Sequence, residues 1–167
     1  MPKGLKIVVA AVCAIIGVVA IALVGLRDLA RRPDYCAQCH VMAPYVASWV
    51  DSDYLAYNHA IFAIACQECH EWNVSGLVRE VTNTISHNYQ EPLPPRSFPN
   101  EACTRCHGDY DQLAKRTQDF PRNPHASPHG QMNCQDCHRM HAPSVDQCAA
   151  CHDPIIAKAG WVSAPKQ

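Results

Sequence analysis

Five copies of one short motif, Cys-x-x-Cys-His, constrain this 167-residue chain more than any other feature of its sequence. Ten of the eleven cysteines fall in these copies, whereas a random shuffle of the same composition would give about 0.04 copies. The odd total also means that the cysteines cannot all form internal disulfides. The copies are Cys36-x-x-Cys39-His40, Cys66-x-x-Cys69-His70, Cys103-x-x-Cys106-His107, Cys134-x-x-Cys137-His138 and Cys148-x-x-Cys151-His152.

This spacing is the attachment pattern for c-type haem. The two thiols add to the two vinyl groups of the porphyrin, and the next residue, histidine, reaches the iron from one face of the ring. Zinc sites also use Cys-x-x-Cys pairs, but zinc does not require a histidine directly after every pair. A thioredoxin-like redox pair would not recur five times. We therefore expect five covalently bound haem c groups, each with its motif histidine as one axial ligand.

Five further histidines match the number of sixth ligands that five haem irons need. His141 follows His138 by three residues, which on a helix would place both on one face. We therefore expect His141 to serve a neighbouring haem. His125 and His129 each follow a proline, which predicts an extended or turning segment rather than a helix. The five candidate distal ligands are His59, His87, His125, His129 and His141.

Met42, two residues after His40, has two interpretations. It is either a core methionine or an axial ligand of the first haem, which would raise the potential of that haem relative to one with two histidines. The spacing alone favours the core methionine.

Residues 7–26 form an apolar run whose only ionisable group is that of Cys13. As a helix this run spans roughly 30 Å, the thickness of the hydrocarbon core of a bilayer. The alternative is a cleaved signal peptide, but its apolar region is usually only ~7–15 residues long. No small-x-small cleavage site follows Leu26. We expect residues 1–32 to be an uncleaved membrane anchor.

The charges that flank the apolar run do not set its orientation, because lysines precede it and arginines follow it. The haem motif does, since it implies attachment on the outer side of the bacterial cytoplasmic membrane. Residues 33–167 would then lie in the periplasm. The net charge of −1 argues against a nucleic-acid partner.

The remaining pattern predicts a mainly α fold with much irregular structure: one N-terminal transmembrane helix plus a haem-packed multihaem cytochrome c domain. Apolar residues at intervals of three or four predict a helix over residues 74–89. We expect a second helix over 109–117 and a short one within 41–64, and no strand pattern stands out. The proline-rich link 91–95 divides a two-haem, membrane-proximal part, 33–95, from a three-haem part, 96–167.

The first two motifs and the residues between them resemble the NapC/NirT/NrfH family of membrane-anchored quinol dehydrogenases. The resemblance rests on Cys36-x-x-Cys39-His40-Val41-Met42, then Ser48-Trp49, then Cys66-x-x-Cys69-His70, and it covers roughly residues 5–115. It implies that the first haem lies near the membrane beside a quinol pocket. It also implies that Met42 ligates that haem.

The chain departs from this family in three respects. It has five motifs where four are usual, and Tyr54 stands near the place of a family histidine that follows the tryptophan. The acidic and lysine residues of the quinol pocket have no clear counterpart, and Thr82 and His87 occupy that region. His87 therefore has two candidate roles, distal ligand or proton acceptor.

The C-terminal part is similar to small periplasmic tetrahaem cytochromes, including the haem domain of soluble fumarate reductases. This similarity rests on His125-x-x-x-His129-Gly130-x-Met132, the fourth motif with His141, and the fifth motif. It implies two closely stacked haems, each with two histidine ligands.

Together these features predict an electron carrier, with quinol dehydrogenase activity as its enzymatic function and no catalytic side chain. It would pass electrons from menaquinol through five haems to a periplasmic redox protein. The alternatives are a relay subunit of a larger membrane complex, such as an alternative complex III-like assembly, and a subunit of an extracellular cytochrome filament. A haem enzyme acting on a small substrate such as nitrite would need an open iron position, against which the count of spare histidines argues.

Overall fold

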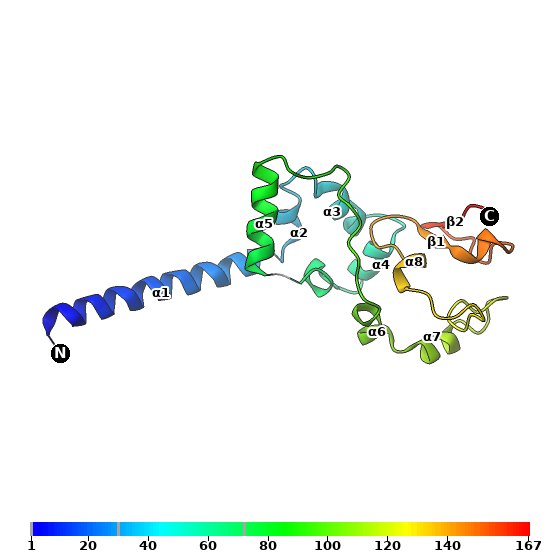
Figure 1. Cartoon of the computed structure of the whole chain (residues 1–167), viewed down its shortest axis with the longest axis horizontal. Helices are drawn as coiled ribbons and strands as arrows, with labels where there is room; N and C mark the ends of the chain where they lie inside the picture. Colours follow the sequence, from blue (N-terminus) through cyan, green and yellow to red (C-terminus); the bar gives the residue numbers. More distant parts are fainter. Residues whose placement is uncertain (1, 30, 72) are drawn as a thin grey trace.

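A long N-terminal helix and a small, irregular domain make up the chain (Figure 1). The computed structural model describes residues 2–29, 31–71 and 73–167. Helix α1 (Lys3–Leu29) extends away from the domain and has no buried residue. Among the described residues it is the one helix that is long and apolar enough to cross a membrane, by length and composition. It exceeds the predicted segment 7–26 at both ends, because the flanking charged residues are themselves good helix formers.

The domain consists of short helices joined by long irregular segments, with two very short strands. This confirms the predicted mainly α class. The elements after α1 are α2 (Pro33–Cys36), α3 (Ala43–Val50), α4 (Leu55–Ala60), η1 (Cys66–Glu68), α5 (Val74–Ile85), α6 (Glu101–His107), α7 (Tyr110–Arg116), α8 (Cys134–Cys137), β1 (Ser144–Asp146), η2 (Gln147–Ala150) and β2 (Trp161–Ser163).

Side-chain caps set where several of these helices begin. Asn73 caps α5 by accepting a hydrogen bond from the Gly76 N–H at 2.7 Å, and Asp109 caps α7 in the same way. At the other end α5 stops at Ile85, four residues before the predicted end. His87 adopts a left-handed backbone conformation with φ of 54°, which cannot continue a helix.

The segment 41–64 forms two helices where one was predicted. Helices α3 and α4 pack against each other, and hydrogen bonds join them to the C-terminal part of the chain. The Ala56 N–H donates to the Met140 carbonyl at 2.9 Å. This contact joins a segment that follows the first motif to the segment that follows the fourth.

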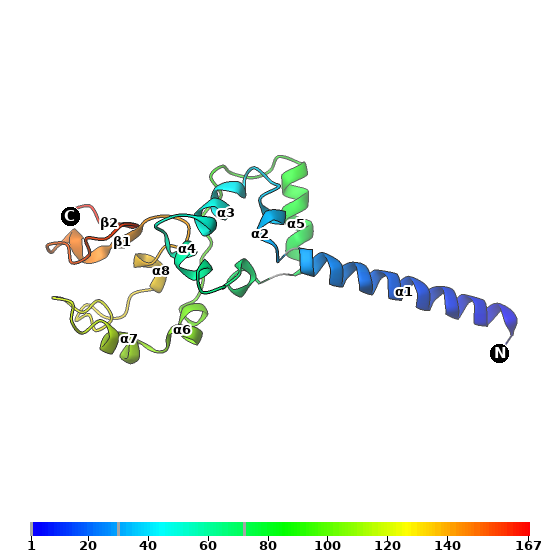
Figure 2. The ribbon, with the colours of Figure 1, turned by 180° about the vertical axis from the view of Figure 1, so that it is seen from behind.

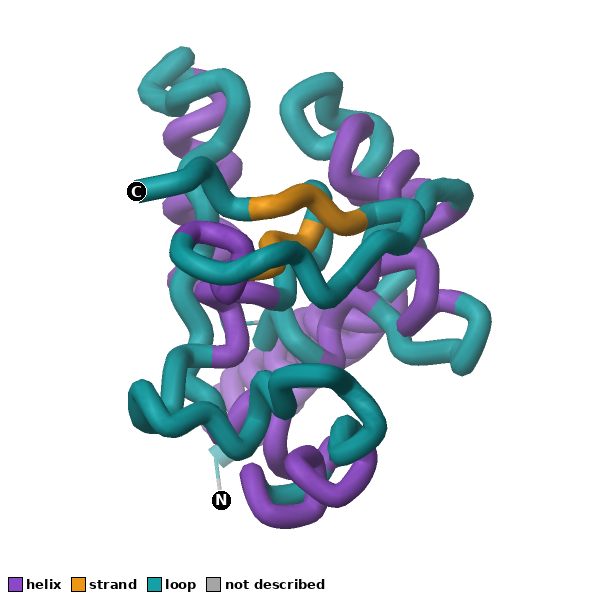
Figure 3. The backbone as a smooth tube through the Cα atoms, turned by 90° about the vertical axis from the view of Figure 1, so that its right-hand side faces the viewer, coloured by secondary structure: helices purple, strands orange, loops and turns teal. Residues whose placement is uncertain are grey.

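The two strands were not predicted. β1 and β2 pair in parallel, with Val145 opposite Val162, and lie among loops (Figure 3). All three residues of β1 are buried. A three-residue strand is too short to show the alternation from which strands are recognised.

Side-chain packing alone supplies little core. The exposed surface is 12035 Å², whereas a compact protein of 18.5 kDa exposes about 8,200 Å². The long α1 contributes part of the excess, and the domain contributes the rest through its loosely packed loops. Among the residues that the structure describes, the buried apolar ones are Val41, Ala56, Val145, Ala149 and Ala164, and none of these is large.

Candidate haem sites

Four of the five Cys-x-x-Cys-His motifs coincide with about one turn of helix, whereas the first lies in a turn that directly follows α2. Cys66–Glu68 is a 3-10 turn, the third motif lies inside α6, and Cys134–Cys137 is α8. A helical turn brings the first and fourth residues of a segment to one side. The two thiols therefore face the same edge of a ring, and the histidine follows beside them. None of the cysteines takes part in a disulfide.

Four of the five motif histidines lie opposite a histidine from outside the motifs. The pairs join segments that are 13 to 71 residues apart in sequence. The ring centres are separated by 5.9 Å for His107 and His59, 6.3 Å for His70 and His141, 6.1 Å for His138 and His125, and 6.4 Å for His152 and His129.

These separations fit a metal ion between the two rings. A metal–imidazole bond of about 2 Å on each side, plus about 1 Å from each nitrogen to its ring centre, gives about 6 Å. The rings of His125 and His138 are also nearly parallel, with 5° between their planes. Among the described residues no group of three or more His, Cys, Asp or Glu side chains gathers around a common point. The histidine donors instead form pairs, and two axial ligands are what an iron held by a porphyrin binds.

A buried serine orients one of these histidines. Ser48 Oγ donates to the Tyr45 carbonyl at 2.7 Å, so its single proton is committed. It lies 2.8 Å from His141 Nδ1 and must therefore accept the Nδ1–H. This fixes the tautomer of His141 and leaves the Nε2 lone pair free to bind a metal ion.

Two more histidines are oriented in the same way. His59 Nδ1–H donates to the Leu55 carbonyl at 2.7 Å, one helical turn back along α4. His125 Nδ1 lies 3.1 Å from Thr117 Oγ1. The Thr117 hydroxyl donates its proton to the Leu113 carbonyl or to Asn123 Oδ1, so its oxygen accepts from the ring. In both histidines Nε2 is the nitrogen left for a metal ion.

Burial favours the neutral form of four of the paired rings. It lowers the pKa of His138, His125 and His141 below the ordinary value of 6.5. It also lowers the pKa of His70, and the nearby Arg96 guanidinium adds to that effect. A neutral imidazole is the form that binds a metal ion.

The histidine of the first motif, His40, has different neighbours. It is exposed, and its Nε2 lies 3.4 Å from Tyr89 Oη and 3.6 Å from Glu91 Oε2. The Tyr89 ring also lies 6.4 Å, centre to centre, from the ring of His87. Met42 is half-buried directly before α3. The structure thus places Tyr89 and Glu91 beside His40, and His87 beside Tyr89.

An unpaired cation lies near the fifth motif. Arg122 Nη2 donates to the Asp153 carbonyl, while Arg122 Nε is buried without a hydrogen-bond partner among the described residues. Its charge also lowers the pKa of Cys148, although burial raises that pKa by more. A haem carries two propionate carboxylates, and a buried guanidinium N–H is suited to such an acceptor. The separations of the paired histidine rings, their neutral form and the Arg122 Nε–H donor all fit covalently bound haem.

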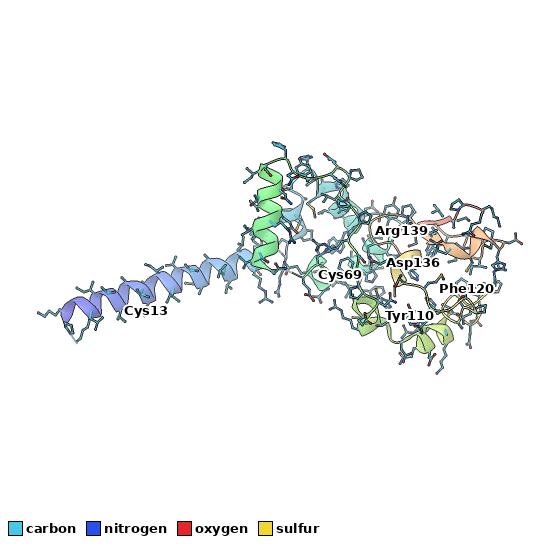
Figure 4. The ribbon with its side chains drawn as sticks, viewed as in Figure 1. Cys13, Cys69, Tyr110, Phe120, Asp136 and Arg139 are labelled. Atoms are coloured by element: carbon cyan, nitrogen blue, oxygen red, sulfur yellow. The ribbon has the colours of Figure 1, made fainter. Side chains whose placement is uncertain are left out.

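Sequence reasoning did not find the residues that orient the histidines. Ser48 is 93 residues from His141, and no local pattern connects the two. The ring of Trp161 lies edge-on to His138 at 5.3 Å, and Arg96 lies 3.3 Å from His70 Nδ1. These two residues are 23 and 26 residues from their partners in sequence, too far for a local pattern to connect them. Figure 4 shows Cys13, the cysteine outside the motifs, on α1, far from Cys69 and Tyr110 in the domain.

Comparison with known proteins gives a consistent result. A family model described as cytochrome c3 matches residues 58–153. The cytochrome c-type protein Cgr1 of Eggerthella lenta is 29% identical over an alignment of 185 residues, which covers 89% of this chain and 86% of that protein. The probable fumarate reductase Ifc3 of Shewanella frigidimarina is 32% identical over 103 residues, which covers 62% of this chain and 14% of that protein. No solved structure matches.

Proposed function

We propose, from the premise that this chain belongs to the cytochrome c3 family of multihaem electron-transfer proteins, that it is a membrane-anchored pentahaem cytochrome. It takes electrons from menaquinol at the membrane and passes them to a periplasmic acceptor. The family membership itself accounts for covalently bound haem c and electron transfer. The number of haems, the anchor and both partners are the proposal.

The observation that carries this proposal is the set of four histidine pairs. We assign His59 to the haem of the third motif, His141 to the second, His125 to the fourth and His129 to the fifth. His141 then serves a haem other than that of its neighbour His138, in keeping with the sequence-based expectation. Two of the pairs connect the parts on either side of the proline-rich link.

Haem c supplies the one-electron chemistry when bound. The side chains of the chain set the conditions for it. Paired neutral histidines favour a six-coordinate, low-spin iron, and Ser48, Leu55 and Thr117 hold three of the rings in place through Nδ1. Ligation by histidine alone gives lower potentials than ligation by methionine and histidine, and a low-potential quinol is able to reduce such acceptors.

The first haem is the proposed point of electron entry. Oxidation of a quinol releases two protons along with two electrons, so its site needs proton acceptors. Glu91, with Tyr89, lies beside His40 on an exposed part of the domain. We assign Glu91 as the acceptor and leave Met42 or His87 as the sixth ligand of the first haem. This part of the proposal also includes the NapC/NirT-type anchoring suggested by the first two motifs.

The proposed acceptor is a reductase in the periplasm. The match to a stretch of a protein described as a probable fumarate reductase supports this choice, since that stretch lies within the chain of a reductase.

Anaerobic mixing of the detergent-solubilised holoprotein with a menaquinol analogue tests the proposal. Mass spectrometry of the same sample should first give five attached haems. Reduction by quinol, blocked by a quinone-site inhibitor and slowed in Glu91→Gln, supports the dehydrogenase. The matched control is Glu71→Gln, which alters an exposed carboxylate next to the second motif. Reduction of all haems by dithionite and of none by quinol would instead make the chain a relay that is fed by a partner membrane subunit.

A further inference from the structure

Helix α5 carries an apolar stripe on its exposed face. Val74, Val78, Val81 and Ile85 fall within an arc of about 60° at 3.6 residues per turn. Their exposed fractions are 49%, 59%, 48% and 76%. An amphipathic helix of a water-soluble protein normally packs such a stripe inward. The stripe on α5 therefore needs an apolar neighbour outside the domain.

The opposite side of α5 is the one that packs on the domain. Gly76 is buried and Asn83 is half-buried, and both lie about 180° around the helix from the centre of the stripe. Glu80 pairs with Arg96 at 3.4 Å, which ties the same side of the helix to the segment after the proline-rich link. The stripe consequently points away from the domain.

The position of α5 indicates what the stripe meets. Figures 1 and 2 show α5 beginning beside the C-terminal end of α1 and running across the direction of α1. The domain lies on one side of α5, and α1 leaves on the other. The stripe therefore faces the side on which α1 would enter a bilayer.

We propose that α5 is an interfacial helix, with its apolar stripe inserted at the headgroup–acyl boundary of the bilayer that α1 crosses. This inference rests on the membrane anchoring that forms part of the proposed function. A membrane-spanning helix alone leaves the domain free to rotate and tilt, whereas a second contact fixes its orientation. Tyr89 and Glu91, which follow α5, lie beside His40, so the same contact holds the exposed side of the first motif at the membrane surface.

Thiol labelling of the full-length holoprotein in vesicles tests this inference. The motif cysteines are consumed as thioethers, so Cys13→Ser leaves a background without free thiols. Val81→Cys places one thiol in the stripe, and Arg79→Cys places a matched thiol on the same helix outside it. In phosphatidylcholine–phosphatidylglycerol vesicles, a membrane-impermeant maleimide should modify Val81→Cys about tenfold more slowly than Arg79→Cys. Equal rates would overturn the inference.

Two controls distinguish contact of the stripe with the bilayer from contact with protein. Protection of Val81→Cys that disappears when each vesicle holds at most one protein would identify a second copy as the cover and overturn the inference. A benzophenone amino acid in place of Val81 should form a photoadduct with lipid, and an adduct with the protein itself would contradict it. Failure of the protein to float with the vesicles would show beforehand that the anchoring, and not the role of α5, is wrong.

Discussion

Replacing Ser48 by alanine should raise the reduction potential of the haem that we assign to the second motif. Ser48 accepts the Nδ1–H of His141 at 2.8 Å, and it is only 7% exposed. This hydrogen bond makes the imidazole a stronger electron donor and so favours the ferric iron. Removal of the hydroxyl weakens that donation and favours the ferrous iron.

The magnitude follows from the same contact. A lost partner that orients a metal ligand changes metal affinity by about 10- to 100-fold. If the ferric state loses about tenfold more affinity than the ferrous state, the potential rises by about 59 mV for one electron. The buried Nδ1–H and the Tyr45 carbonyl also lose their partner, at a cost of about 1–3 kcal/mol in folding free energy.

A spectroelectrochemical titration of the Ser48→Ala holoprotein measures the shift, and thermal unfolding measures the loss of stability. Ser52→Ala is the matched control, because Ser52 makes two hydrogen bonds at the same helix end without contacting a histidine. It should lower stability and leave every potential unchanged. In a His141→Ala background, Ser48→Ala should add no further shift. An unchanged titration in Ser48→Ala alone, or an equal shift in Ser52→Ala, would refute the role of Ser48.

Three further outcomes are expected. His129→Ala should open the sixth position of one haem and produce a high-spin signal with carbon monoxide binding in the ferrous state; a fully low-spin spectrum would contradict the assigned pair. Arg122→Gln removes a positive charge beside the fifth motif and should lower the reduction potential of one C-terminal haem, by about 59 mV for a tenfold change in its reduction equilibrium. Arg122→Lys keeps the charge and should leave most of that potential unchanged. Burial lowers the pKa of His138 and His141 in the folded state, so the unfolded chain binds more protons once the pH falls below about 6.5. The free energy of unfolding should therefore decrease from that pH downward. A denaturation midpoint that stays constant between neutral and mildly acidic pH would argue against these rings being held neutral.

Covalently bound haem c could be predicted from the sequence because the signal for its attachment is local. Two thiols and a histidine within five residues define the chemistry without any tertiary structure. The mainly α class and the membrane-length helix were also predictable, since each depends on composition and periodicity over a short window.

The pairing of histidines could not be predicted, because it is a property of the fold. His59 and His107 are 48 residues apart, and only the folding of the chain brings their rings to 5.9 Å from each other. The single exception is His141, whose spacing from His138 already argued for a different haem. The short strands escaped prediction for a similar reason, since Ser144–Asp146 owes its strand conformation to pairing with β2.

The uneven surroundings of the motif histidines bear on the direction of electron flow. Four of these histidines face another histidine across about 6 Å. His40 instead faces groups that exchange protons, Tyr89 and Glu91, and it belongs to the motif nearest α1 in sequence. Transfer between paired-histidine haems needs no proton, whereas oxidation of a quinol does. Under the proposed function, the chemistry that requires protons would be confined to the end of the chain that the proposed bilayer contact holds at the membrane. We therefore propose that end as the entry point for electrons and the C-terminal motifs as the exit.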